Sequence, residues 1–196
     1  MDPDFIRRRC RELSTELLQV EVFIQSGEYT PDALSIYREE LAARVGDLDA
    51  FVAAERERTG EEQLRLEVSE FKQTGSSAPT RANAVLVPLR GALHFTSTGV
   101  GFLPAGVKPA LQSVPLSLLG RLDQALFFAP RDEIGLFELR GRVWSLRARN
   151  NVTARARLAP DRVDHVAHWA NDAGIRLNRC EAPAGLWEAV KGIFRS

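Results

Sequence analysis

The stretch RVWSLRARNNVTARARL, residues 142–158, decides how the second half of this chain folds. Apolar and polar residues alternate on both sides of Asn150-Asn151, which is the period of a β-strand with one buried face. A two-residue loop would set Trp144 opposite Arg157 and mix apolar with charged side chains. A three-residue loop keeps apolar residues together, so we predict a hairpin with these pairs: Ala148 with Val152, Leu146 with Ala154 and Trp144 with Ala156.

This register gathers four arginines on one face of the hairpin: Arg147, Arg149, Arg155 and Arg157. The guanidinium group binds phosphate and carboxylate groups bidentately, so the face predicts a site for an anionic lipid, a phosphorylated ligand or an acidic protein. A solvated strand face is the alternative. Few exposed aromatic residues accompany these arginines and the chain has no net formal charge, which argues against nucleic acid.

A second hairpin is predicted from GALHFTSTGVGFLP, residues 91–104. A two-residue turn at Thr98-Gly99 would pair Phe95 with Phe102. Leu93 would then lie on the same buried face, and His94 would point the other way, as an exposed strand histidine. Further along, residues 161–174 predict a helix that begins at Pro160-Asp161, ends at Gly174 and buries a Val/Ala stripe.

Residues 83–178 thus combine antiparallel strands, a basic hairpin and one closing helix. This order resembles the pleckstrin-homology-like superfold, in particular its GRAM-like bacterial versions. The stretches GALHFTSTGVGFLP and VPLSLLGRLD and the helix of residues 161–174 carry the resemblance. It implies a half-barrel closed by a C-terminal helix and a binding module for lipid headgroups, peptides or protein surfaces, without fixing which of these is bound.

The first third of the chain has helical periods. Residues 2–26 show a heptad seam, and Thr30, Pro31 and Asp32 form the start signal of a second helix that runs to Thr59-Gly60. The first seam comprises Ile6, Cys10, Leu13, Leu17, Val20 and Ile24. The second comprises Leu34, Tyr37, Leu41, Val45, Leu48 and Phe51 or Val52. The short connection makes the two helices antiparallel neighbours.

Two single stripes bury little surface alone, so the helices need an intramolecular bundle, a second copy or a partner protein. EEQLRLEVSEF, residues 61–71, supplies either a third helix or a strand. The tail of residues 179–196 has an amphipathic stretch that covers the protein's own core or docks elsewhere. The residues predicted for oligomerisation or partner contact are Leu13, Leu17, Leu34, Leu41, Leu48, Leu186, Trp187, Val190 and Phe194.

A polar, Gly/Ser/Pro-rich stretch, KQTGSSAPTRAN at residues 72–83, is the clearest boundary. The prediction is an α+β chain with a helical hairpin or coiled coil at 1–73, a linker at 74–82, an antiparallel PH-like domain at 83–178 and a tail at 179–196. Residues 1–80 carry a net charge of −7 and residues 81–196 a net charge of +7. This asymmetry favours an anionic partner for the second part, or contact between the two parts.

One helix face offers a competing chemistry. Asp161, His165, His168 and Asp172 recur at spacings that place them on one side of the predicted helix. Histidine and carboxylate groups are metal ligands, so a metal protein or an enzyme is an alternative function. The same face lies opposite the apolar stripe, so solvation also explains its polarity.

The sequence has no glycine-rich phosphate loop, nucleophile elbow or paired-cysteine motif. It also has no apolar run long enough to span a membrane and no secretory signal. Cys10 and Cys180 are therefore expected to be reduced thiols in a cytoplasmic protein. The first interpretation is a non-enzymatic adaptor that self-associates through its helices, uses no cofactor or metal, and binds a protein partner or an anionic surface. A structural subunit of a larger assembly is the other alternative.

Overall fold

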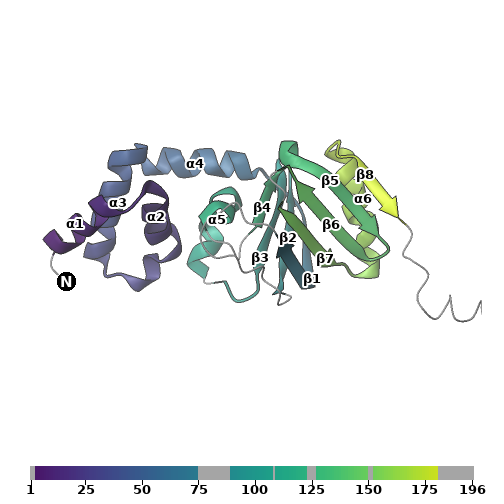
Figure 1. The fold of residues 1–196 in the computed structure, drawn as a ribbon, viewed down its shortest axis with the longest axis horizontal. Coiled ribbons are helices and arrows are strands. Elements are labelled where there is room, and N and C mark those ends of the chain that lie inside the picture. Colours follow the sequence, from purple (N-terminus) through teal and green to yellow (C-terminus); the bar gives the residue numbers. More distant parts are fainter. Residues whose placement is uncertain (1–2, 75–88, 108, 123–126, 150–151, 181–196) are drawn as a thin grey trace, which may run out of the picture.

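The computed structural model describes residues 3–74, 89–107, 109–122, 127–149 and 152–180. The fold is α+β, with helices and one eight-stranded sheet within these ranges. Figure 1 shows an elongated molecule with a helical lobe (residues 3–59) at one end and a sheet body (residues 61–180) at the other. The predicted linker at 74–82 and the tail from residue 181 lie outside the described residues, apart from the backbone of Thr74.

The helical lobe contains more breaks than the sequence periods predict. Its elements are α1 (Pro3–Glu12), α2 (Thr15–Gln19), a π-helical turn (Val20–Ile24), a 3₁₀ turn (Ser26–Glu28), α3 (Pro31–Val45) and α4 (Leu48–Thr59). The predicted first helix breaks because Ser14 caps α2, its Oγ accepting from the Leu17 N–H at 3.3 Å. The predicted second helix breaks at Gly46, which has a φ of 85°, and Asp47 then caps α4.

The break at Ser14 changes which side chains the heptad buries. Ile6 and Cys10 are buried as predicted, but Leu17 is 52% exposed and Leu18 is buried in its place. A continuous seam over residues 2–26 is therefore wrong. The predicted start of the second helix is confirmed, because the Thr30 side chain caps α3 and Pro31 occupies its first turn.

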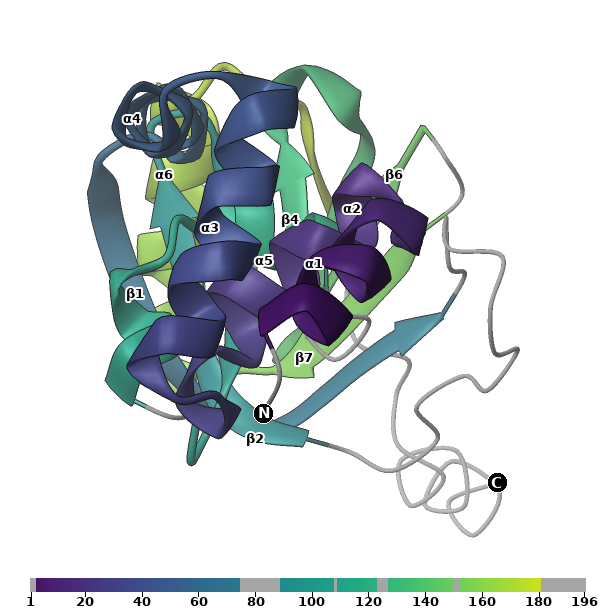
Figure 2. The ribbon, with the colours of Figure 1, turned by 90° about the vertical axis from the view of Figure 1, so that its left-hand side faces the viewer.

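The lobe buries apolar side chains of its own helices against one another, which is the intramolecular alternative of the sequence analysis. The core comprises Ile6, Cys10, Leu18, Val22, Ala33, Ile36, Tyr37 and Leu41. Arg44 on α3 donates to the carbonyls of Leu13, at 2.6 Å, and Cys10, at 2.9 Å, and so ties α3 to the end of α1. Burial raises the pKa of the Cys10 thiol, so the neutral form is favoured there. Figure 2 views the molecule from the end that holds the helical lobe, with α4 seen along its axis and α3 from the side.

The sheet has the strand order β4-β3-β2-β1-β7-β6-β5-β8. All neighbouring strands pair antiparallel except β5 and β8, which pair parallel. The sequence predicted an antiparallel sheet, but the observed sheet is mixed. The strands are β1 (Glu62–Thr74), β2 (Leu89–Thr96), β3 (Gly99–Pro104), β4 (Phe127–Pro130), β5 (Ile134–Arg140), β6 (Val143–Ala148), β7 (Thr153–Arg157) and β8 (Leu177–Cys180).

The first strand corrects the predicted division of the chain. Residues 62–74 pair with both β2 and β7, so they form a strand and not a third helix. The helical region therefore ends at Thr59, and the sheet begins before the predicted domain boundary at residue 83. Leu64, Leu66 and Val68 alternate with polar residues, so a strand turns all three toward the core of the sheet. The strand alternative of the sequence analysis is therefore the observed one.

The two predicted hairpins differ in accuracy. The β6–β7 register is confirmed, with Trp144 opposite Ala156 and Leu146 opposite Ala154. The β2–β3 turn lies at Ser97-Thr98, so Leu93 and not Phe95 is opposite Phe102. A shift of two residues keeps the same face inward, and all three of these apolar side chains are fully buried.

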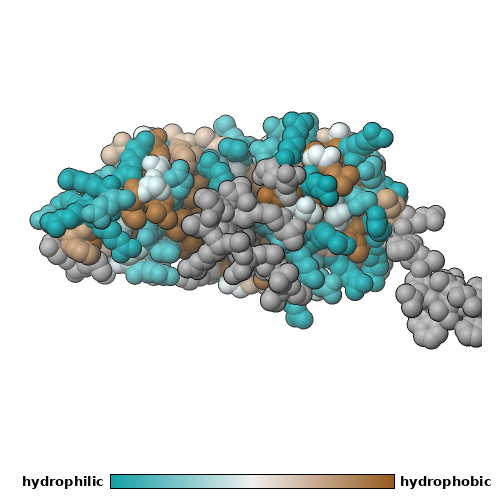
Figure 3. All heavy atoms as spheres, in the orientation of Figure 1, coloured by the Kyte–Doolittle hydropathy of each residue, from teal (hydrophilic) through white to brown (hydrophobic). Residues whose placement is uncertain are grey.

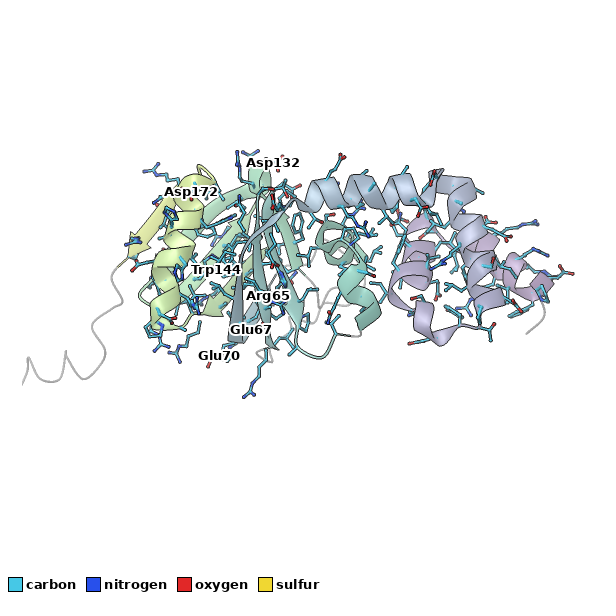
Figure 4. All side chains as sticks on the ribbon, turned by 180° about the vertical axis from the view of Figure 1, so that it is seen from behind. Arg65, Glu67, Glu70, Asp132, Trp144 and Asp172 are labelled. Atoms are coloured by element: carbon cyan, nitrogen blue, oxygen red, sulfur yellow. The ribbon has the colours of Figure 1, made fainter. Side chains whose placement is uncertain are left out.

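One helix packs on the inner face of the sheet. Helix α6 (Val163–Asp172) follows a 3₁₀ turn (Pro160–Arg162) and buries Val166, Ala167, Trp169 and Ala170 in the sheet's core. The indole N–H of Trp169 donates to the Thr96 carbonyl at 3.2 Å. Figure 4 shows Trp144 between the sheet and α6. The side chains of the sheet's other face, which we call the outer face, point away from α6.

A short helix, α5 (Leu116–Leu122), joins the lobe to the body. The buried carboxylate of Glu55 on α4 accepts from Ser117 Oγ at 2.6 Å and pairs with Arg121. Thr59 Oγ1 accepts from the Ser117 N–H at 3.1 Å. Figure 1 shows α5 between the helical lobe and the strands.

Replacing Leu41 tests whether the helical lobe is a self-contained core. We expect Leu41→Ala to lower the free energy of unfolding by about 2–5 kcal/mol, because the side chain is fully buried. Leu17→Ala is the matched control, with an expected change below about 0.5 kcal/mol at an exposed site. Urea denaturation followed by circular dichroism measures both. Equal effects of the two substitutions would contradict the lobe core described above.

The contact between α4 and α5 has its own test. Glu55→Ala leaves Ser117 and Arg121 without their acceptor, so we expect a loss of about 1.5–3 kcal/mol in the free energy of unfolding. Glu57→Ala, at an exposed position on the same helix, should change stability little. Chemical denaturation of the three proteins distinguishes these outcomes, and an unaffected Glu55 variant would mean that the contact contributes nothing.

Candidate anion-binding face

The four predicted arginines lie together on the outer face of the sheet. Arg147 is on β6, Arg149 follows its end, Arg155 and Arg157 are on β7, and all four are exposed. They are not directly opposite one another, which relieves the like-charge crowding that the sequence pattern predicts. The register pairs them with uncharged residues: Arg147 with Thr153, Arg155 with Ser145 and Arg157 with Val143.

A fifth cation comes from β1. Lys72 is exposed and lies directly opposite Arg155 in the β1–β7 pair. We call Lys72, Arg147, Arg149, Arg155 and Arg157 the basic face. None of them forms an ion pair with another residue in the described part of the chain. The basic face therefore carries positive charge that no carboxylate in the described ranges offsets. The Lys72–Arg155 pair in particular is expected to be destabilising, because its two like charges lie directly opposite each other in the sheet.

A hollow of about 270 Å³ lies within this face and includes Arg147 and Arg155. Glu138 on β5 lines it and is already engaged. Its carboxylate accepts from Ser145 Oγ at 3.3 Å and from Cys180 Sγ at 3.4 Å, and it lies 3.5 Å from Arg140. The single carboxylate of the hollow is thus held by β5 and its neighbours and does not neutralise the basic face.

His94 departs from its sequence prediction. It was expected to be exposed, but only 6% of its surface is accessible, and it lines a hollow together with residues 103–107 and 112–116. Its Nδ1 is hydrogen-bonded to the Glu62 carboxylate, and its Nε2 has no hydrogen-bond partner among the described residues. No local sequence signal predicts this, because the residues that cover His94 are distant in the chain.

The alternative metal face does not assemble as a ligand set. His168 Nε2 lies 3.3 Å from Asp172, whereas Asp161 pairs with Arg162 at 3.1 Å. His165 is exposed on the same helix. Within the described residues, no three His, Cys, Asp or Glu side chains are grouped so as to hold a metal ion.

The residues predicted for oligomerisation or partner contact differ in how far they are buried. Leu41 is buried and Leu13, Leu34 and Leu48 are partly buried, so Leu17 is the one that is exposed. Figure 3 shows hydrophobic side chains over the helical lobe in this view, between hydrophilic ones. The tail residues lie outside the described residues: Leu186, Trp187, Val190 and Phe194.

Comparison with known proteins leaves the family open. No protein-family model matches the chain, and no curated protein matches it. Among solved structures, "Structure of the Spt16D Pob3N heterodimer" matches with 12% sequence identity and a TM-score of 0.40, over 63% of this chain. The chain spans 57% of the length of that neighbour. No helix in the described ranges is both long and apolar enough to cross a membrane.

Reversing the charge of Lys72 tests the electrostatics of the basic face. Lys72→Glu places opposite charges across the β1–β7 pair, so we expect a gain of about 0.2–1 kcal/mol in the free energy of unfolding. Lys72→Gln, which only removes the repulsion, should gain less. Urea denaturation at low and high salt measures both, and salt should reduce the gain. A Glu variant less stable than the Gln variant would refute the repulsion between Lys72 and Arg155.

Proposed function

We propose that this chain is a non-enzymatic interaction module that binds an acidic protein partner on the basic face. The observation that carries the proposal is the set of five exposed cationic side chains without an ion-pair partner in the described part of the chain. Arginine suits such a role, because its planar guanidinium group donates two parallel hydrogen bonds to one carboxylate.

The strand arrangement supports a binding module. An up-and-down run from β1 to β4, a second run from β5 to β7 and the packed helix α6 agree with the PH-like resemblance of residues 83–178. In this interpretation β1, at residues 62–74, is the first strand of the module. Modules of this kind act by presenting a surface to a ligand, and the surface residues set which ligand is bound.

A protein partner fits the basic face better than a lipid surface does. Glu138 lies among the cations, and its carboxylate would repel a uniformly anionic membrane. A protein segment can place its carboxylates beside the arginines and uncharged groups beside Glu138, so it avoids this repulsion. The hollow also includes the partly buried side chains of Leu136 and Val143, which provide apolar contact beside the charges.

Self-association through the helical lobe is a second candidate function. Phe5 on α1 and Leu17 on α2 are the large apolar side chains that remain exposed in the described residues, at 57% and 52%. Both belong to the lobe that lies at the far end from the basic face (Figure 1). Self-association there would leave the basic face free for a different partner.

Replacing two arginines tests the proposed function. A fluorescein-labelled peptide of ten glutamates is the probe, and its binding is measured by fluorescence anisotropy. Arg147→Gln/Arg155→Gln should weaken binding by about tenfold or more, because charge-assisted hydrogen bonds are lost. The affinity of the unmodified protein should also fall as salt is raised.

The matched control changes the same net charge elsewhere. Arg7→Gln/Arg8→Gln removes two exposed arginines from α1 and should leave binding of the probe almost unchanged. If both double variants weaken binding equally, net charge and not the basic face holds the probe, and the proposal fails. Vesicles containing phosphatidylserine form the second arm, and binding of vesicles without binding of the peptide would favour a membrane surface instead.

A further inference from the structure

A second hollow, which we call the outer cleft, lies on the outer face of β1, β2 and β3. Its volume is about 490 Å³. One wall is β1 with Glu62, Arg65 and Glu67, and Figure 4 shows Arg65, Glu67 and Glu70 following one another along that strand. The opposite wall is formed by residues 103–107 and 112–116, and the end of α4 closes the top.

The floor of the outer cleft is β2, where small residues leave room. Gly91 and Ala92 line it, together with His94 and Thr96. From Gly91 to Thr96 the strand rises about 17 Å, at roughly 3.3 Å per residue. An extended peptide of about five residues has the same length. The cleft is therefore a trough along a strand, and its dimensions suit an elongated occupant.

The buried histidine gives this trough an unmatched hydrogen-bonding group. The Glu62 carboxylate can only accept a hydrogen bond, so Nδ1 of His94 is the donor. In the tautomer that carries a single ring proton there, Nε2 is an acceptor. Nε2 is buried and has no partner among the described residues. A buried acceptor without a donor is unfavourable, and an N–H group of an occupant would supply the missing hydrogen bond.

The trough continues into a basic end. A neighbouring hollow of about 480 Å³ shares Glu67, Gly91 and Ala105 with the outer cleft. It is lined by three arginines: Arg90, Arg142 and Arg157. Inside the outer cleft, by contrast, Arg65 lies 3.4 Å from Glu67, so those two charges offset each other. An occupant that spans both hollows meets a nearly neutral middle and a positive end.

We propose that the outer cleft binds an extended peptide segment of a partner protein. One N–H of the segment donates to His94 Nε2, and a carboxylate at its far end lies over Arg90 and Arg142. This site differs from the one in the proposed function, because its floor is β2 and not the β6–β7 hairpin; of the basic face, Arg157 alone also lines the basic end of the trough. Each site can be tested, and fail, without the other.

Selection from a random peptide library tests the proposal with the full chain. Displayed linear heptapeptides are selected on the purified protein, and the enriched peptides are synthesised for affinity measurement. Ala92→Phe is the blocking variant, because Ala92 lies on the cleft floor and faces away from the sheet's core. Ala54→Phe, at an exposed position of α4, is the matched control. Thermal unfolding establishes that each variant is folded.

Three results are expected. Enriched peptides carry Asp or Glu near one end, lose at least tenfold in affinity for Ala92→Phe, and bind Ala54→Phe unchanged. Arg90→Gln/Arg142→Gln weakens acidic peptides about tenfold and spares versions in which the acidic residue is replaced by its amide. In ¹⁵N NMR spectra, the Nε2 resonance of His94 shifts when peptide is added.

Other results would overturn the proposal. The outer cleft is not a peptide site if no peptide is enriched, or if enriched peptides bind a folded Ala92→Phe variant with full affinity. Binding that leaves the His94 Nε2 resonance unmoved would also exclude the proposed contact. If Ala92→Phe does not fold, the same decision rests on His94→Phe, which keeps an aromatic ring but removes the acceptor. Loss of binding in Arg147→Gln/Arg155→Gln alone would place the peptide on the basic face.

Discussion

The buried carboxylate of Glu55 determines how the two parts of this protein are joined. It binds Ser117 and Arg121, and so fixes α5 against α4. Helix α5 in turn covers the outer face of β3 and β4, as shown by the close approach of Leu116 to Gly101. The start of α5 and the residues before it form part of the second wall of the outer cleft, which His94 also lines. A charge with little accessible surface thus supports the shape of a binding site that it does not line.

The long strand β1 is the second element on which the architecture depends. Its first half pairs with β2 and its last residues pair with β7, with an irregularity between Val68 and Phe71 where the partner changes. Such an irregularity bends a strand and increases its twist. One strand therefore connects the half of the sheet that forms the outer cleft with the half that forms the basic face.

The sequence predicted the features that depend on neighbouring residues. The alternation around Trp144 fixed the β6–β7 register and placed the four arginines correctly, because period-two patterns report one buried face. It could not predict the burial of His94, which depends on a helix more than twenty residues away. It also missed Lys72, because an acidic segment with alternating leucines is consistent with both helix and strand. The heptad pattern before Gly27 predicted the wrong buried residues after Ser14. This serine caps a new helix, and the break changes which side chains face the core.

Helix α4 has a consequence for the dimensions of any assembly that this protein builds. It is anchored at one end by Leu48 in the helical core and at the other by Thr59 and Glu55 at the sheet body. Its 12 residues span about 18 Å, at 1.5 Å per residue. Gly60 then turns with a φ of 73°, and an added Cβ would lie 2.5 Å from Ser97 Oγ, so the chain leaves the helix in one direction. The helix therefore contributes to the distance between the helical lobe and the sheet body (Figure 1).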